Sequence, residues 1–425
     1  MRPDAIRARP ASSPDVGAGP RPRPGGPTET AMIESRPPPR RRRSFSLRSR
    51  FLRGLLYQLL AIGLIALGVW FLAHNTLENM RVRGIQSGFD FLTQPAGFDI
   101  GESLIPYEAM NAYWHAFGVG VVNTLRVAVI GIVLTTVLGT LLGVGRFSGN
   151  ALVRGACYAY VELFRNIPVL LQLLVWYLLL TEWLPAADEP LSLFGVFFLS
   201  KGGLAYPVPV WGLGQGLAAV GGAVGLIAAW GWARAARAHF DRTGRPRPVL
   251  LPGLMLVLAA SLGGWVAGGA PTAWNLPVLL EAAVDGGASL TPEFLAVLLG
   301  LVLYTSAFVA EVVRAGIASV PRGQSEAASS LGLSQGLAMR LVVLPQALRV
   351  IIPPMTNQYL NLTKNSSLAV AIGYPDVVSI SNTAINQTGR AVECIALIML
   401  VYLSTSLLTS GIMNWYNRRA AIKER

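Results

Sequence analysis

The sequence has few of the residues on which metal-binding, phosphate-binding and disulfide-linked sites depend. Its 425 residues include two cysteines, three histidines and three lysines. Cys157 and Cys394 are far apart in the sequence, which excludes a disulfide framework. No two histidines have the spacing of metal ligands, so we expect no metal site. Lys201, Lys364 and Lys423 all lie outside any GxxxxGKS or GxxxxGKT pattern, which excludes a Walker A phosphate loop in this chain.

Charged residues are also scarce, at 13% of the chain, whereas 52% of the residues are hydrophobic. This charged share is about half that of an ordinary soluble domain, which argues against a soluble globular enzyme. The net charge of +13 is concentrated at the N-terminus, where residues 1–53 hold thirteen arginines and four acids. A basic tail before an apolar body is typical of a membrane protein with a cytoplasmic N-terminus. Nothing after the tail has the features of a nucleic-acid recognition module, so we expect no nucleic acid among the partners.

The N-terminal 53 residues are rich in Pro, Arg, Gly and Ser and have few large apolar side chains. Such a segment cannot bury enough apolar surface to offset the entropy of ordering, so we expect a disordered basic cytoplasmic tail. It has no short apolar run before a small-residue cleavage site, so it is not a signal peptide. Met32 is an alternative to Met1 as the start of the chain.

Eight stretches are long and apolar enough to cross a bilayer as helices. A helix rises about 1.5 Å per residue, so a hydrocarbon core of about 30 Å requires about 20 mostly apolar residues. The eight stretches are Leu55–Ala73, Val119–Gly145, Tyr158–Leu180, Trp211–Ala233, Val249–Gly269, Phe294–Val313, Ala347–Gly373 and Val392–Met413. The sequence therefore predicts an all-α membrane protein, a polytopic bundle of about eight transmembrane helices.

The charges of the connecting segments indicate how such a bundle is oriented. Eight crossings place both termini on the same side of the membrane. Beyond the tail, the segments assigned to the cytoplasm hold fifteen Lys and Arg, whereas the segments assigned to the outside hold four. Positively charged residues are enriched in cytoplasmic loops, so we expect both termini in the cytoplasm.

One connecting segment, between the sixth and seventh stretches, has its own secondary-structure signals. Its sequence, EAASSLGLSQGLAMRLVVLPQALR, starts at Glu326. Glu326, Ala327 and Ala328 favour helix, Gly332 permits a sharp chain reversal, and Pro345 can start the next helix. This pattern predicts a short helix, a glycine turn and a second helix, which together form a compact cytoplasmic protrusion.

This segment resembles the EAA loop of the permeases of binding-protein-dependent ABC importers. Gly332 follows Ala328 by four residues, and Leu344 and Pro345 follow a dozen residues later. Three further strings are similar to the polar amino-acid branch of that family, namely NTLRVAVIGIVLTTVLGTLLGVGR, YVELFRNIPVLLQLL and PPMTNQYLNLTKNSSLAVAIGYPD. Together with AFVAEVVRAGIASVPRGQ, they extend the resemblance over most of residues 119–414.

The resemblance implies a type I ABC importer permease fold and a permease subunit that moves polar L-amino acids across the bacterial inner membrane. The substrates would be glutamate, glutamine, aspartate and asparagine, or a broader range. It also implies that the segment couples the permease to a dimer of ATP-binding subunits through Glu326, Ala327, Ala328, Gly332, Leu344 and Pro345. The chain itself would be no enzyme and hold no cofactor, because ATP and Mg²⁺ would be bound by that partner. An amphipathic surface helix without a partner is the alternative interpretation of the segment.

Further partners are implied in the same way: a second homologous permease or a second copy of this chain, a periplasmic amino-acid-binding protein, and the lipid bilayer. A minimal permease of this branch has five spans, which the matching strings place in the second, third, sixth, seventh and eighth stretches. The expected layout is a tail over 1–53, a first helix and periplasmic loop over 54–118, the permease domain over 119–414 and a cytoplasmic tail over 415–425. Residues 182–290 would be an insertion that carries two extra helices, which resembles the longer general L-amino-acid permeases of Gram-negative bacteria.

Polar residues inside the apolar stretches are candidates for an amino-acid pathway, because a zwitterion needs polar partners of both signs without a deep electrostatic trap. The candidates are Glu311, Arg314, Asn357, Asn361, Lys364, Asn365, Ser366 and Ser367. Pro353 and Pro354 are expected to interrupt the helix there, which favours a cavity beside Asn357 and Asn361. The alternative is packing alone, with Glu311 and Lys364 in interhelical ion pairs and the Asn and Ser groups in interhelical hydrogen bonds.

Two other classes of function compete with the importer. A secondary transporter driven by an ion gradient predicts inverted repeats and paired broken helices, which the sequence lacks, and it leaves the EAA-like segment unexplained. A membrane-embedded enzyme predicts paired carboxylates, metal ligands or a nucleophile, and we find no such group of catalytic residues. The sequence does not specify which amino acids are carried or whether the permease pair is made of one chain or two.

Overall fold

The computed structural model describes residues 50–82, 84, 87–280 and 283–420. The chain divides into two units, Met1–Thr76 and Leu77–Arg425. Helix α1 (Arg50–Val82) holds the first apolar stretch, and the tail expected over 1–53 lies outside the described residues up to position 49. Within the described residues, seven helices are long and apolar enough to cross a membrane, or eight if one sharply bent pair is counted as a span. The polytopic helical fold is confirmed.

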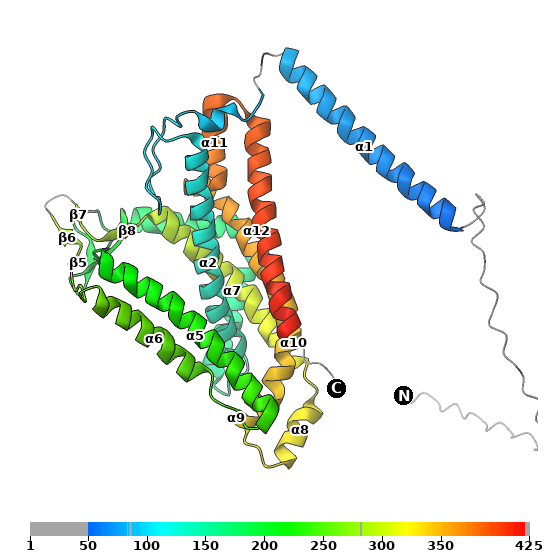
Figure 1. The fold of residues 1–425 in the computed structure, drawn as a ribbon, viewed down its shortest axis with the longest axis vertical. Helices are drawn as coiled ribbons and strands as arrows, with labels where there is room; N and C mark the ends of the chain where they lie inside the picture. Colours follow the sequence, from blue (N-terminus) through cyan, green and yellow to red (C-terminus); the bar gives the residue numbers. More distant parts are fainter. Residues whose placement is uncertain (1–49, 83, 85–86, 281–282, 421–425) are drawn as a thin grey trace, which may run out of the picture. The chain divides into compact units, whose positions relative to one another are not determined.

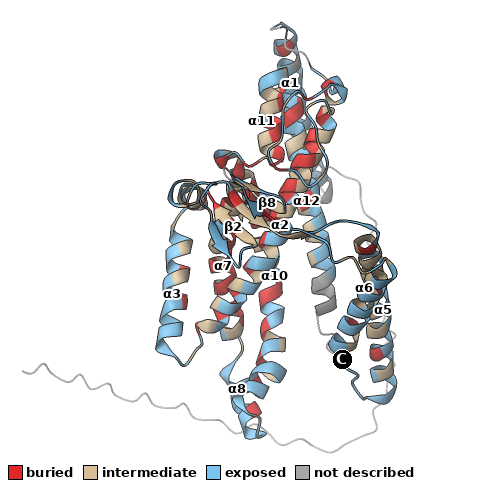
Figure 2. Cartoon of the chain, turned by 90° about the vertical axis from the view of Figure 1, so that its left-hand side faces the viewer, coloured by how far each residue is buried: buried red, intermediate tan, exposed pale blue. Residues whose placement is uncertain are grey.

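Four long helices form the centre of the second unit, with α2 packed on α7, α7 on α10 and α10 on α12 (Figure 1). They are α2 (Tyr113–Gly145), α7 (Pro292–Ala318), α10 (Leu344–Asn365) and α12 (Ala391–Ala420). Glycines let α2 and α7 approach closely. A Cβ atom at Gly139 would lie 2.5 Å from Val309 Cγ1, and one at Gly143 would lie 2.8 Å from the Ala310 carbonyl oxygen. Buried residues gather along these contacts (Figure 2), as expected where van der Waals packing drives helix association in lipid.

The third apolar stretch is not one straight helix, so the continuous span expected over Tyr158–Leu180 is wrong. Helix α3 (Ala151–Asn166) ends before Pro168, α4 (Val169–Leu178) begins after it, and the two helices are bent by 103°. Ile167 between them has an extended backbone, with ψ of 127°. Steric clash with a following proline ring disfavours the helical conformation, which explains the break at this residue.

The backbone at this bend has a side-chain partner. The Gln172 amide donates hydrogen bonds of 2.9 Å to the carbonyl oxygens of Phe164 and Ile167. Gln172 is buried, so it satisfies carbonyl groups that the end of α3 leaves without helical partners. The chain then continues through α4 into a single π turn, η2 (Leu179–Trp183), and α4 packs against α7.

Helix α10 runs without a break through Pro353 and Pro354, so the interruption expected there is also wrong. Both prolines are exposed, whereas Ile351 and Met355 are buried in the apolar contact with α7. A proline ring that faces no neighbouring helix costs its own hydrogen bond and leaves the packing intact. The α-helical geometry ends only at Asn365, where a 3₁₀ segment, η4, begins.

A cap of extended chain and one short helix covers one end of the bundle. Segment η4 (Ser366–Ile372) turns at Gly373, which has φ of +81°, and leads into α11 (Val377–Thr388). Residues 87–112, with the 3₁₀ turn η1 (Asp90–Thr93), pack over α2, α11 and the start of α12 around Phe91, Tyr113 and Val377. The Arg390 guanidinium anchors this segment, because it donates to the Gly88 carbonyl at 2.6 Å and to Asp90 Oδ1 at 2.5 Å.

Residues 182–290 contain the two extra helices that were expected there. They also contain short strands, which the all-α expectation did not include. Helix α5 (Leu213–Thr243) and helix α6 (Leu250–Ala267) lie side by side (Figure 1). An antiparallel sheet in the order β1-β2-β3-β8 contains β1 (Leu191–Leu193), β2 (Phe197–Ser200), β3 (Gly203–Tyr206) and β8 (Ala288–Leu290). Two strand pairs accompany it, β4 (Val208–Pro209) with β5 (Trp274–Asn275), and β6 (Val278–Leu279) with β7 (Val284–Asp285).

Candidate functional site

The segment between α7 and α10 folds as a helix, a glycine turn and a second short helix, as predicted. Helix α8 (Arg322–Ser330) is followed by Gly332, which has φ of +76°. Two backbone hydrogen bonds close the turn, from Leu333 N to the Ala328 carbonyl at 3.1 Å and from Gly332 N to the Ser329 carbonyl at 2.9 Å. Only glycine adopts this left-handed conformation without strain, so the residue type fixes the direction in which the chain leaves α8.

A second helix returns the chain to the bundle. The Ser334 side chain caps α9 (Gln335–Ala338), which runs through the π turn η3 (Met339–Val343) into α10. Pro345 lies in the first turn of α10, directly after the π turn. The Gln346 amide donates a 3.2 Å hydrogen bond to the Gln324 side chain, which ties the start of α10 to α8.

The two sides of this protrusion, residues 322–343, differ in character. Ala328 and Ala338, one in each of its two helices, are buried. Glu326 and Ala327 are exposed, and so are several large apolar residues, of which Leu331 is the most accessible, with 81% of its surface exposed. Leu337 and Leu341 are 48% and 60% exposed. Leu344 and Pro345 belong to α10 and lie at the base of the protrusion rather than at its tip.

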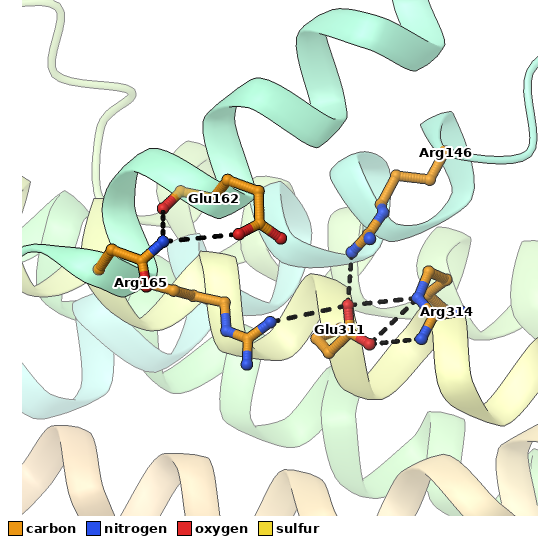
Figure 3. A network of polar contacts seen from close by, with 6 residues as sticks. Arg146, Glu162, Arg165, Glu311 and Arg314 are labelled. Carbon is orange, nitrogen blue, oxygen red and sulfur yellow. Dashed lines mark hydrogen bonds and ion pairs between the residues drawn. The ribbon is translucent and has the colours of Figure 1, made fainter.

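A cluster of one carboxylate and three guanidinium groups joins α2, α3 and α7 (Figure 3). Glu311 Oε2 accepts a 2.5 Å hydrogen bond from Arg146, and Glu311 Oε1 accepts one of 2.5 Å from Arg314. Arg165 Nη1 lies 3.9 Å from the same carboxylate. Arg146 also lies 4.0 Å over the Tyr158 ring. The cluster therefore has an excess of positive charge, and Glu311 pairs with these arginines rather than with Lys364.

The candidate pathway residues of α10 fall into two groups. Asn357, Asn361 and Lys364 are exposed, and their spacing of four and three residues places them on one face of the helix. The hydroxyls at the end of α10 face the backbone instead, since Ser366 donates to the Thr363 carbonyl at 2.7 Å and Ser367 to the Lys364 carbonyl at 2.8 Å. Asn365 lies between the two groups and is half-buried.

A polar cavity that sequence patterns did not reveal lies under the cap. It has a volume of about 310 Å³, and its lining residues include Asp99, Glu102, Glu293 and Thr383. Arg126 of α2 forms an ion pair with Glu102. The elements that meet here are residues 98–102, the start of α7 and α11, so no single stretch of sequence signals the cavity. Among the described residues, no group of three or more His, Cys, Asp and Glu could hold a metal ion.

Asp376 is a second group without a sequence signal. Its Oδ1 atom caps α11 by accepting a 2.8 Å hydrogen bond from Ser379 N, and Oδ2 lies 3.5 Å from the Tyr402 hydroxyl. Burial raises the pKa of this carboxyl to about 7, against the effect of the backbone N–H groups of Ser379 and Val378. Because Asp376 is fully buried at the turn between η4 and α11, its protonation state bears on how the cap is held.

Comparison with known proteins places the chain in a family. A family described as the binding-protein-dependent transport system inner membrane component matches residues 248–422. The chain is 44% identical to the general L-amino acid transport system permease protein AapQ of Rhizobium johnstonii, over 88% of this chain and 93% of that protein. It is 37% identical to the glutamate/glutamine/aspartate/asparagine transport system permease protein BztB of Rhodobacter capsulatus, over 88% and 95%. The chain therefore belongs to the inner-membrane permeases of binding-protein-dependent transport systems, on the branch that contains the general L-amino acid permeases.

Proposed function

We propose that this chain is the membrane-spanning subunit of an importer for polar L-amino acids, driven by ATP hydrolysis in a separate pair of subunits that dock on the protrusion. The observation that carries the proposal is the protrusion itself. Its turn is held by backbone hydrogen bonds and its exposed side is apolar at Leu331, Leu337 and Leu341. A rigid element with an apolar tip can seat in a groove of a partner and transmit a rigid-body movement.

The names of the relatives support polar amino acids as substrates, with glutamate, glutamine, aspartate and asparagine as the narrower set. The exposed face of α10 supplies two amide groups and one ammonium, at Asn357, Asn361 and Lys364. These groups can bind the carboxylate and side chain of a zwitterion without a permanent pair of opposite charges. A periplasmic binding protein selects the ligand and delivers it, and this chain needs no cofactor of its own.

The exposed position of that face in a single chain favours a pathway closed by two permease subunits, either two copies of this chain or this chain and a homologue. Both termini and the protrusion lie in the cytoplasm, and the cap and the strands lie in the periplasm. In this layout the permease domain extends over 119–414, after residues 54–118 and before the tail at 415–425. Residues 182–290 are an insertion, which the self-contained pairing of α5 with α6 supports.

The test is uptake of labelled glutamate and glutamine by vesicles that contain the complete purified complex. We expect the vesicles to accumulate the labelled amino acid only when ATP is present on the side of the membrane that carries the ATPase. This accumulation should persist when ion gradients are collapsed. Leu331→Glu should lower both uptake and copurification of the ATPase, because a charge at the tip opposes burial in an apolar groove. Leu104→Glu, at an exposed leucine outside the protrusion, is the matched control. Uptake driven by an ion gradient without the ATPase would show a secondary transporter instead.

A further inference from the structure

Helices α5 and α6 form a pair with nearly touching backbones. A Cβ atom at Gly225 would lie 2.6 Å from Val257 Cα, and one at Gly221 or Gly264 would overlap a carbonyl oxygen of the opposite helix. Near the connecting turn, the Trp232 indole donates a 3.1 Å hydrogen bond to the Pro248 carbonyl. The two helices are therefore closely packed against each other, and the Trp232 hydrogen bond fixes the end of the pair next to the connecting turn.

The outer surface of this pair is apolar and exposed. Leu226, Ile227 and Trp230 of α5 and Leu254 and Leu258 of α6 each have more than half of their surface accessible. Among the described residues, neither helix packs extensively against any other helix of the chain (Figure 2). In a membrane this surface is covered by lipid acyl chains.

The end of the pair at the 244–249 turn is strongly basic. Between residues 234 and 249 there are five arginines and one acid, Asp241. Arg234 lies 3.7 Å over the Trp230 ring, and the other four arginines are exposed. Aromatic and arginine side chains at the end of an apolar helix pair typically lie at the depth of the lipid headgroups in the membrane.

A cavity of about 320 Å³ opens at this end between α5 and the turn. It is lined by two arginines, Arg237 and Arg247, by one acid, Asp241, and by Ala236, Phe240, Pro246 and Val249. Within the described part of the chain, neither the Arg237 nor the Arg247 guanidinium has a hydrogen bond or ion pair with another residue. Two guanidinium groups without partners beside apolar walls match the requirements of a phosphodiester attached to acyl chains.

We propose that this cavity binds the headgroup of an anionic phospholipid, whose acyl chains lie along the outer surface of α5 and α6. Arg237 and Arg247 hold the phosphate, whereas Arg234, Arg242 and Arg245 lie outside the cavity lining. The bound lipid holds the helix pair in position at the membrane interface. The pair needs such a contact because it has little other packing within the chain. Basic pockets at the cytoplasmic side of transmembrane helices recognise anionic lipids in this way. In the proposed topology the lipid is in the cytoplasmic leaflet.

Three competing roles for the arginines lead to different predictions. If these residues act only as a signal for insertion, their number matters and their position does not. If they bind an acidic surface of the ATPase, their loss should release that subunit and leave lipid binding unchanged. A free phosphate ion would use the same guanidinium groups without needing the apolar surface. The experiment therefore compares pairs of arginines with equal charge and different positions.

The test uses the complete complex in detergent, titrated with phosphatidylglycerol or with phosphatidylcholine of the same acyl chains, with bound lipid counted by native mass spectrometry. We expect preferential binding of phosphatidylglycerol, weakened about tenfold by the double variant Arg237→Gln and Arg247→Gln. The double variant Arg242→Gln and Arg245→Gln removes the same charge outside the cavity and should bind nearly as the original chain. Millimolar inorganic phosphate should not displace the lipid. Membrane abundance and retention of the ATPase are measured for each variant.

The proposal is overturned if the two lipids bind equally, if both double variants lose binding to the same extent, or if inorganic phosphate displaces the lipid. It is also overturned if the cavity variant releases the ATPase and keeps its lipid. These readouts do not depend on uptake. The proposed lipid site can therefore be refuted while the importer function stands, and the importer function can be refuted while the lipid site stands.

Discussion

Arg146 at the end of α2 donates a 2.5 Å hydrogen bond to Glu311 of α7, and only 6% of the Arg146 side chain is exposed. The same carboxylate accepts from Arg314, one turn further along α7. One acid therefore pairs with a buried guanidinium on the neighbouring helix and with a second one on its own helix. Since α7 leads directly into the protrusion, this contact fixes the base from which α8 projects.

Replacing that acid should destabilise the bundle. Glu311→Gln leaves Arg146 buried without a negative partner, and we expect the free energy of unfolding to fall by about 2 kcal/mol, since a pair broken on one side leaves an uncompensated charge. Thermal unfolding of the purified permease measures the change. Glu162→Gln, at an exposed carboxylate on α3, is the matched control. Equal stability of both variants would mean that the contact between Arg146 and Glu311 does not contribute to the free energy of unfolding.

The conformation of Gly332 makes a separate prediction about coupling. Gly332→Val places a branched side chain at φ of +76°, which costs about 1–2 kcal/mol for a residue in the left-handed region. We expect ATP-dependent uptake to fall while the protein remains in the membrane. Gly336→Val provides the control, because Gly336 also has open space around its Cβ position but has no positive φ. Normal uptake by the Gly332 variant at equal abundance would remove the turn from the coupling mechanism.

The turn at Gly332 could be predicted because it depends on the conformational range of one residue. The helix expected to start at Pro345 begins earlier, at Gln335, and runs through α9 and η3 into α10. The bend between α3 and α4 had a similar local signal, the Ile167-Pro168 pair, but the apolar run around it favoured a single helix more strongly. Hydrophobicity reports that a segment is in the membrane and is insensitive to a change of direction within it. The prolines of α10 led to the opposite error, since the effect of Pro353 depends on which face it occupies.

Contacts between distant segments could not be predicted in this way. Glu311 was a sound candidate for an ion pair, but its partners come from the ends of α2 and α3, and only the packing of these helices on α7 brings them together. The acidic residues that line the cavity under the cap come from residues 98–102 and the start of α7. The periodicity of one segment does not indicate which distant segments contact it. Short strands such as β6 and β7 are missed for another reason, because two residues are too few for an alternation of polar and apolar residues to be recognised.

The polar face of α10 should contribute to substrate passage. Asn361→Leu removes an exposed amide on this face, and we expect the rate of amino-acid uptake to fall about tenfold, as when a polar ligand group loses its partner. Ser367→Ala is the comparison, because that hydroxyl donates to the backbone carbonyl of Lys364. If only the serine variant loses uptake, the pathway follows another face and the asparagines have a packing role.

Asp376 predicts a pH dependence of stability. Its pKa is raised to about 7 from the usual value of 3.8, mainly by burial, so the folded protein binds a proton that the unfolded chain releases. The stabilising contribution is complete below about pH 4 and is lost as the pH rises toward 7, with a slope of up to about 1.4 kcal/mol per pH unit. Asp376→Asn keeps the cap on α11 and has no proton to lose. Melting temperatures between pH 5 and 8 should therefore fall for the original chain and vary less for this variant, whereas Asp188→Asn, at an exposed position, should follow the original chain.

The orientation of the helices gives the last prediction. Segments assigned to the cytoplasm hold fifteen Lys and Arg against four on the other side, and the end of the α5 and α6 pair supplies five of the fifteen. Because this bias is read near the membrane, reporter fusions after Arg245 and Gly323 should be cytoplasmic, and fusions after Pro185 and Trp274 should be periplasmic. A periplasmic result at Arg245 alone, with the other three as expected, would mean that α5 and α6 do not cross the membrane as a pair. Since two crossings restore the side from which the chain left, that result would leave the protrusion in the cytoplasm and would move only the proposed lipid site.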